Sequence, residues 1–268
     1  MQIKDQLPSA NSYHLNTALS HQMAIERVIL AMRERLHEPL SLEDLADIAH
    51  LSPCHFSRVF HRLIGVPPSE FLAALRMDAA KRLLLTTSLS VTDICFEVGY
   101  TSLGSFTTRF TQLVGMPPRQ LRQVAEGFAM PSLDSLHDSN SYTFCHVPSL
   151  GGCFFGRVSA PSNFAGLIFV GLFPKPIPQG RPACCTLLHT PGWYLMKSLP
   201  DGCYYIFAVA IPFPAERHAH LLLGNGLFVG ISQGPLFICN GKMSGQPDIA
   251  LRPPRLTDPP IVVALPFV

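Results

Sequence analysis

The sequence predicts a chain of two parts, an all-α region with two helix-turn-helix units followed by an all-β antiparallel sandwich. One observation is a change of composition: residues 1–130 hold 24 of the 38 charged side chains, whereas 17 of the 25 prolines follow Pro131. Charged, proline-poor sequence suits helices, whereas proline is common in the turns that connect strands. The other two observations are an internal repeat in the first half and short apolar runs in the second.

Composition excludes several classes of protein. With 47% hydrophobic and 14% charged residues and a net charge of +2, the 268-residue chain is expected to be globular, not disordered. Its longest apolar runs, at 164–173 and 203–213, are far shorter than the roughly 20 residues of a bilayer helix. The N-terminus lacks the pattern of a secretory signal, so we expect a cytoplasmic protein without membrane contact. The eight cysteines form no C-x-x-C pair, so we expect thiols, no metal site and no cofactor.

The repeat aligns residues 55–68 with residues 105–118, at an offset of 50. Two phenylalanines, a leucine, a glycine and a Pro-Pro pair stay in register. Upstream, residues 41–46 align with residues 90–95 at an offset of 49. The unit is therefore duplicated, with one more residue in the turn of the second copy.

Each copy has the pattern of a helix, a tight turn and a second helix. In the first copy Ser41 is placed to cap the first helix, Ser52 to cap the second, and Gly65 to end it. Residues 70–85 between the copies are expected to form a helix of about 16 residues, roughly 24 Å long. Such a spacer can set the second helices about 34 Å apart, so that both enter successive major grooves of one duplex. The inward positions follow helical spacing: Phe56, Val59, Phe60, Leu63, Phe106, Phe110 and Leu113.

These residues resemble the tandem helix-turn-helix domain of the AraC/XylS family of bacterial transcription regulators, over about residues 22–126. The resemblance implies sequence-specific binding to double-stranded DNA. The motifs that carry it are Leu45-Ala46, Ser52, residues 55–60, Gly65, Pro68, Arg76, Ala80, Leu83-Leu84, Ile94, residues 98–100, Ser105-Phe106, Phe110, Gly115, Pro117-Pro118 and Arg122.

The resemblance also implies which side chains meet DNA. Arg58 is the strongest candidate, because a guanidinium pairs bidentately with guanine. The base-reading positions are Cys54, Ser57 and Arg58 in the first unit and Leu103, Gly104, Ser105 and Thr108 in the second. The candidates for holding phosphates are Ser52, His61, Arg62 and Ser102.

One departure concerns Thr108, where the family usually has arginine. Either Arg109 reaches outward to a phosphate, or the second unit reads less sequence than the first; we favour weaker reading. Residues 1–130 carry no net charge, so the placement of basic side chains decides the attraction to DNA. The basic residues that outnumber nearby acids are Arg58, Arg62, Lys81, Arg82, Arg109, Arg119 and Arg122.

The second half has no helical pattern between its apolar runs, apart from a short helix expected at 215–223, and so favours an antiparallel sandwich. Residues 191–210 resemble a hairpin of transthyretin-like and carboxypeptidase-regulatory-like sandwiches. His218 and His220 have metal-like spacing but are interpreted as surface residues. The aromatic residues Trp193, Tyr194, Tyr204 and Tyr205 are expected to belong to the core more than to an effector site. The expected strands are 142–147, 153–159, 166–173, 182–188, 192–197, 203–211, 227–232, 235–239, 248–251 and 261–265.

The expected organisation is an N-terminal extension (1–20), a DNA-binding domain (21–127), a linker (128–141) and a β-sandwich (142–268). The chain carries no G-x-S-x-G, Walker or H-E-x-x-H motif, so we expect no enzyme. The hypothesis is a transcription regulator whose sandwich senses an effector. The alternative is a sandwich that serves only for dimerisation or for binding another protein such as RNA polymerase.

Overall fold

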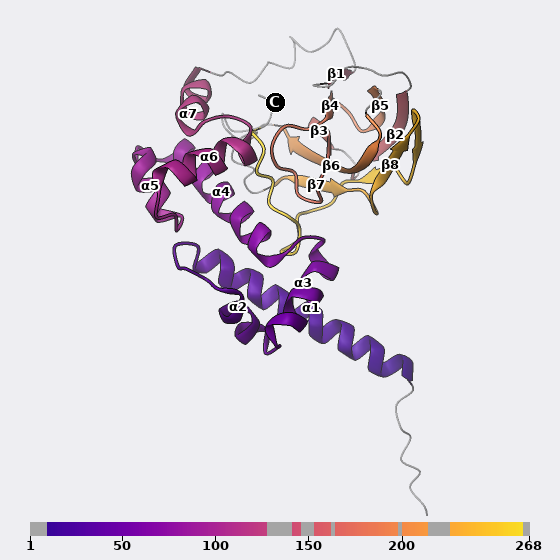
Figure 1. The fold of residues 1–268 in the computed structure, drawn as a ribbon. Helices are drawn as coiled ribbons and strands as arrows, with labels where there is room; N and C mark the ends of the chain where they lie inside the picture. Colours follow the sequence, from indigo (N-terminus) through magenta and orange to yellow (C-terminus); the bar gives the residue numbers. More distant parts are fainter. Residues whose placement is uncertain are drawn as a thin grey trace, which may run out of the picture.

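The computed structural model describes residues 10–127, 141–145, 153–161, 164–197, 200–213 and 226–264. A helical region is followed by a β region, as the sequence predicts, and the two lie against each other (Figure 1). Among the described residues, no helix is both long enough and apolar enough to cross a membrane. The helices are α1 (Ala10–Glu34), α2 (Leu42–Ala49), α3 (Pro53–Ile64), α4 (Pro68–Thr86), α5 (Val91–Glu97), α6 (Leu103–Val114) and α7 (Pro118–Gly127).

The two helix-turn-helix units, α2–α3 and α5–α6, begin with the same hydrogen bonds. The Ser41 side chain accepts a hydrogen bond from the Asp44 N–H, and the Asp44 carboxylate accepts one from the Ser41 N–H. Ser90 and Asp93 repeat this reciprocal cap at the start of α5. Helix α4, which joins the units, has 19 residues and so spans about 29 Å. The first helices of the two predicted repeats, α2 and α5, therefore begin with the same capping box.

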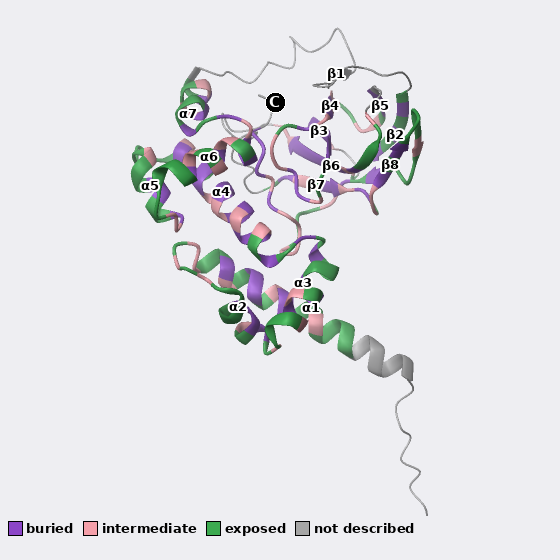
Figure 2. Ribbon diagram, in the orientation of Figure 1, coloured by how far each residue is buried: buried purple, intermediate pink, exposed green. Residues whose placement is uncertain are grey.

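Paired phenylalanines fill the core of each unit. The rings of Phe56 and Phe60 lie 5.6 Å apart, and those of Phe106 and Phe110 lie 5.7 Å apart. All four are fully buried, and Figure 2 shows buried residues interspersed with exposed ones in the helical region. The inward placement predicted for Leu63 is wrong: its side chain is 46% exposed. The chain turns at Gly65 with φ 89°, and Ile64 and Val66 are buried instead.

The β region consists of two sheets that share a core. The larger has the order β1-β4-β3-β6-β8-β9, with β7 also paired to β6, and the smaller has the order β10-β2-β5. All pairs are antiparallel except β10 with β2, which is parallel. The strands are β1 (Ser141–Cys145), β2 (Cys153–Ser159), β3 (Gly166–Phe173), β4 (Cys184–Leu188), β5 (Gly192–Lys197), β6 (Gly202–Pro212), β7 (Phe228–Ile231), β8 (Leu236–Cys239), β9 (Lys242–Ser244) and β10 (Ile249–Ala250).

Side chains of the larger sheet alternate between two cores, as the pleat requires. Along β6, Ile206 and Ala208 join the core shared with the smaller sheet. Phe207 and Val209 point the other way and form a second cluster with Phe173 of β3. The larger sheet is therefore covered on both faces.

Residues 261–264, here called the C-terminal strap, lie between this second face and the helices. Ile261 and Val263 pack into the cluster on the sheet, whereas Val262 and Ala264 belong to the helical core. Among the described residues the strap pairs with no strand: the Val262 N–H bonds to the Pro178 carbonyl, and the Ala264 N–H bonds to a carbonyl of α6. The strand predicted at 261–265 is therefore wrong over its described residues.

Other expectations for the second half have mixed outcomes. The hairpin at Asn240-Gly241, with φ of 50° and 72°, adds the unpredicted strand β9. Tyr194 and Tyr204 are buried as core residues, whereas Trp193 is 70% exposed. The helix expected at 215–223, with His218 and His220, lies outside the described residues, as does the linker except Ser141.

Candidate nucleic-acid interface

Helix α3 presents the candidate residues of the first unit on one open surface. Ser52 precedes the helix, its side chain makes no capping hydrogen bond, and Pro53 occupies the first turn. Cys54 and Arg58 are exposed one turn apart, and the Arg58 Nε lies 3.4 Å from the Cys54 carbonyl oxygen. This contact is solvent-exposed, so the guanidinium can exchange it for a partner outside the chain. His61 and Arg62 are also exposed, and Ser57 is half-buried.

Helix α6 presents a surface of different chemistry. Ser102 caps it by accepting a hydrogen bond from the Ser105 N–H. The candidate positions from Leu103 to Ser105, and Thr108, are exposed and carry no charge. At the offset of 50, Gly104 and Thr108 take the places that Cys54 and Arg58 fill in α3. The two units therefore share a backbone and differ in what they offer to a ligand.

The β region leaves both surfaces uncovered. The β region contacts the helices away from the candidate DNA-binding residues. Gly180 donates to the Leu113 carbonyl in the last turn of α6, and Lys175 pairs with Glu70 at the start of α4. Within the part of the chain that the structure describes, all the candidate residues except the half-buried Ser57 are exposed.

In the helix that follows each unit, one arginine donates hydrogen bonds to the segment that precedes the unit. The Arg76 guanidinium donates to the carbonyl oxygens of Leu36 and Glu38 at 2.9 and 2.7 Å. Arg122 repeats this pattern, donating to the carbonyls of Leu84 and Leu89 at 3.1 and 2.8 Å. We call these contacts the arginine clamps.

The first clamp also lies against the second unit. Gly99, in the turn between α5 and α6, has φ +81°, and a Cβ there would lie 2.5 Å from the Leu36 carbonyl oxygen and 3.1 Å from Arg76. Only glycine fits this turn, because both the backbone angle and the close approach exclude a side chain. The same arginine therefore orders the start of the first unit and the turn of the second.

The structure corrects the list of basic residues expected to attract DNA. Lys81 is fully buried, with its ammonium group 2.7 Å from the Ile261 carbonyl oxygen, and Arg82 pairs with Asp78. Arg122 is committed to its clamp. The sequence showed that Lys81 shares a helix face with Met77 and Leu84, and that spacing marks a buried position.

Arg109 is half-buried, and its charge lies near Tyr100. Burial raises the pKa of the Tyr100 hydroxyl, and the positive charges of Arg109 and Arg76 oppose that rise. This position favours the interpretation that Arg109 does not take over the role of the arginine that the family usually has in place of Thr108. Among the described residues, no group of three or more His, Cys, Asp or Glu side chains is placed to hold a metal ion.

Comparison with known proteins places a helix-turn-helix domain at residues 45–123. An uncharacterized HTH-type transcriptional regulator, YobQ of Bacillus subtilis, is 34% identical over 42% of this chain and 48% of its own length. The regulator GbdR of Pseudomonas aeruginosa is 29% identical over 39% of this chain and 28% of its own. The chain thus spans less than half the length of these relatives.

A third relative, the bifunctional transcriptional activator/DNA repair enzyme AdaA of Bacillus subtilis, is 37% identical over 33% of this chain and 42% of its own length. Because its name includes an enzyme, the expectation that this chain is not one stays a prediction. Among solved structures, the DNA-binding domain of AdpA in complex with a target DNA is 30% identical, with 38% of this chain and 93% of that chain covered and a TM-score of 0.38.

Proposed function

Starting from the AraC/XylS-type helix-turn-helix domain at residues 45–123, we propose that this chain is a sequence-specific DNA-binding transcription regulator whose β-sandwich responds to an effector. In this proposal α3 and α6 enter successive major grooves of one duplex. Arg58 reads a guanine, with Cys54 and Ser57 beside it.

One observation supports the proposal: among the described residues, the candidate faces of both second helices are exposed, and the two units are joined by a single helix of 19 residues. Its length of about 29 Å approaches the roughly 34 Å between successive major grooves on one face of DNA. In the second unit, Leu103, Gly104, Ser105 and Thr108 are the proposed base-reading positions. Ser52, Ser102, His61 and Arg62 position phosphates, aided by the helix N-termini.

The chemistry of the two helices supports unequal reading. An arginine distinguishes guanine by two hydrogen bonds, whereas hydroxyl groups discriminate weakly between bases. We therefore assign most of the sequence preference to α3 and mainly a positioning role to α6.

The test is selection of bound duplexes from a random pool with the full chain, with and without a metabolite extract. We expect an enriched motif in which the half-site read by α3 is the better defined. Arg58→Ala weakens binding to the selected duplex by about 1–3 kcal/mol and leaves helicity unchanged. The control is Arg255→Ala in the β region. No enriched motif, or unchanged affinity in Arg58→Ala, contradicts the proposal.

A specific observation supports the alternative role of the sandwich as an interaction module. Phe155 and Trp193 are 60% and 70% exposed on the open face of the smaller sheet, where strands β2 and β5 pair. Exposed aromatic side chains of this kind are enriched in protein interfaces. Sedimentation of the full chain and of Phe155→Ser/Trp193→Ser measures self-association, and a dimer lost in the double variant supports this role.

A further inference from the structure

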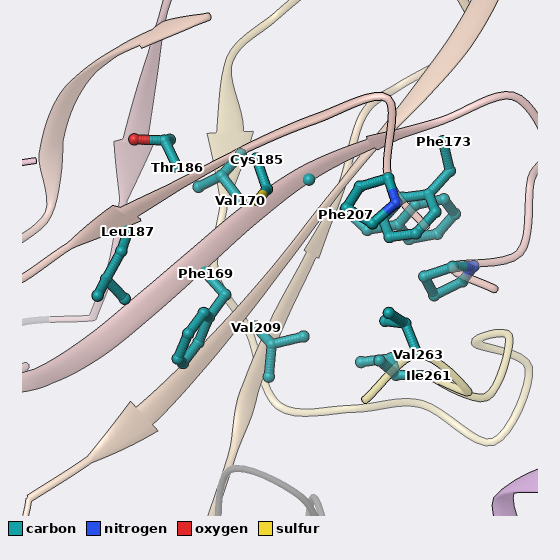
Figure 3. Close-up of a pocket in the computed structure, with 13 residues that line it drawn as sticks. Phe169, Val170, Phe173, Cys185, Thr186, Leu187, Phe207, Val209, Ile261 and Val263 are labelled. Atoms are coloured by element: carbon teal, nitrogen blue, oxygen red, sulfur yellow. The ribbon is translucent and has the colours of Figure 1, made fainter. Parts of the chain in front are cut away.

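The larger sheet and the C-terminal strap line a small, partly open cavity on the side toward the helices. Its space is ≈ 60 Å³. Figure 3 shows the residues that line it. Phe169 and Phe173 of β3 and Phe207 and Val209 of β6 form its floor. Ile261 and Val263 of the strap close it on the other side.

The lining defines the chemistry of an occupant. It contains no charged side chain, and its rings include Phe173 and Phe207, whose centroids lie 5.8 Å apart at 75°. A charged ligand would lose its hydration here and find no charged side chain to replace it. An uncharged aromatic molecule would gain edge-to-face contacts with the rings.

The volume determines what such a molecule must do to enter. An engineered apolar cavity of about 150 Å³ takes up benzene. A space of ≈ 60 Å³ is too small for an aromatic ring unless one wall moves. Phe169 and Val209 lie on paired strands, whereas the strap has no strand partner, so the strap is the wall that yields most easily.

Movement of the strap reaches the helices directly, because its residues alternate between two cores. Ile261 and Val263 face the cavity, and Val262 lies in the helical core. The Lys81 ammonium group on α4 lies 2.7 Å from the Ile261 carbonyl oxygen, 3.4 Å from that of Val262 and 3.5 Å from that of Val263. A ligand that lifts the strap therefore breaks contacts on the helix that sets the two units relative to each other.

We propose that this cavity is the binding site for a small uncharged aromatic molecule, and that its occupation weakens DNA binding by displacing the C-terminal strap from Lys81. The inference rests on the proposed function and names the ligand class and the route. The direction follows from the docked state: both DNA-facing helices are open while the strap holds α4, so this state is competent to bind, and undocking removes its preorganisation.

The probe is toluene, titrated calorimetrically into the full chain and into variants. Val209→Ala enlarges the cavity and binds toluene more tightly than the unmodified chain, whereas Val209→Phe fills it and binds at least about tenfold more weakly. Val158→Ala makes the same deletion in the core between the sheets and leaves toluene binding unchanged. Absence of saturable binding in the unmodified chain and in Val209→Ala overturns the site, as does unchanged binding in Val209→Phe.

Coupling is measured as the affinity for the selected duplex, by fluorescence anisotropy, at saturating toluene. We expect about fivefold weaker DNA binding in the unmodified chain and no toluene effect in Lys81→Met, which still binds toluene. Unchanged DNA affinity at saturation overturns the route through the strap. Failure of the proposed function is distinguishable, because a chain that binds no DNA sequence without toluene fails in the selection, whatever calorimetry shows for the cavity.

Discussion

The ammonium group of Lys81 lies 2.7 Å from the carbonyl oxygen of Ile261, 180 residues further along the chain. Lys81 is fully buried, and Asp78 one turn earlier lies 3.6 Å from it. A charge removed from water is tolerated only with such partners. The contact therefore joins the helix between the two units to the end of the β region.

Stability should depend on the protonation of Lys81. Burial lowers its pKa from 10.5 to about 8, an effect that the charge of Asp78 opposes. Between these values the unfolded chain binds more protons than the folded chain, so the free energy of unfolding rises with pH. Relative to Lys81→Met, the unmodified chain should gain on the order of 2–3 kcal/mol from pH 8 to 10.5. Urea unfolding at a series of pH values measures this difference. If the difference in free energy of unfolding between the two chains did not change with pH, the Lys81 ammonium group would not be desolvated in the folded chain.

The arginine clamps should contribute unequally to stability. Arg76→Ala removes two hydrogen bonds from a charged donor at a half-buried position and should cost about 1.5–3 kcal/mol. Arg122→Ala should cost less, because its bond to Leu89 is solvent-exposed. Urea unfolding compares both with Arg62→Ala, which removes an exposed arginine and should stay within about 0.5 kcal/mol of the unmodified chain. An equal, small effect in all three variants would contradict the structural role of the clamps.

Gly99 and Gly104 form a matched pair of substitutions. Gly99→Ala places a side chain at φ +81° against the Leu36 carbonyl and should destabilise by about 2 kcal/mol or more. Gly104→Ala lies in helix α6, where the nearest side-chain atom is 3.9 Å from the new Cβ, and should stabilise by about 0.4–1 kcal/mol. Thermal unfolding of both variants tests the pair. The opposite order of stabilities would show that the turn does not approach Leu36 so closely.

Arg62 should act on DNA through charge alone. Arg62→Ala should weaken binding uniformly across sequences and reduce the slope of log K against log salt by about 1. Anisotropy titrations at several salt concentrations, on the selected duplex and on a scrambled one, measure both effects. A change of sequence preference in this variant would indicate that Arg62 contacts bases.

Local patterns predicted most of the helical region. The caps at Ser41 and Ser90 and the left-handed glycine at Gly65 depend on a few neighbouring residues, so the duplicated units could be read directly. Leu63 and Ile64 follow Phe60 by three and four residues, so helical periodicity allows either of them to face inward. Only the path of the chain after Gly65 decides between them.

Long-range contacts account for what the sequence did not reveal. Residues 261–264 alternate like a strand because they face two cores, and periodicity cannot distinguish two covering layers from a sheet partner. The helical spacing of Lys81 marks a buried position, but its partners lie at the far end of the chain and have no local signal. Asn240-Gly241, by contrast, is a strong hairpin signal, and the strand after it could have been found.

The placement of Val262 and Ala264 inside the helical core bears on how the protein can be divided for study. A fragment ending near Gly127 would expose the apolar surface they cover and leave Lys81 facing solvent or an empty gap. Such a fragment is expected to be less soluble than the intact chain. Its affinity for DNA would not represent that of the intact chain.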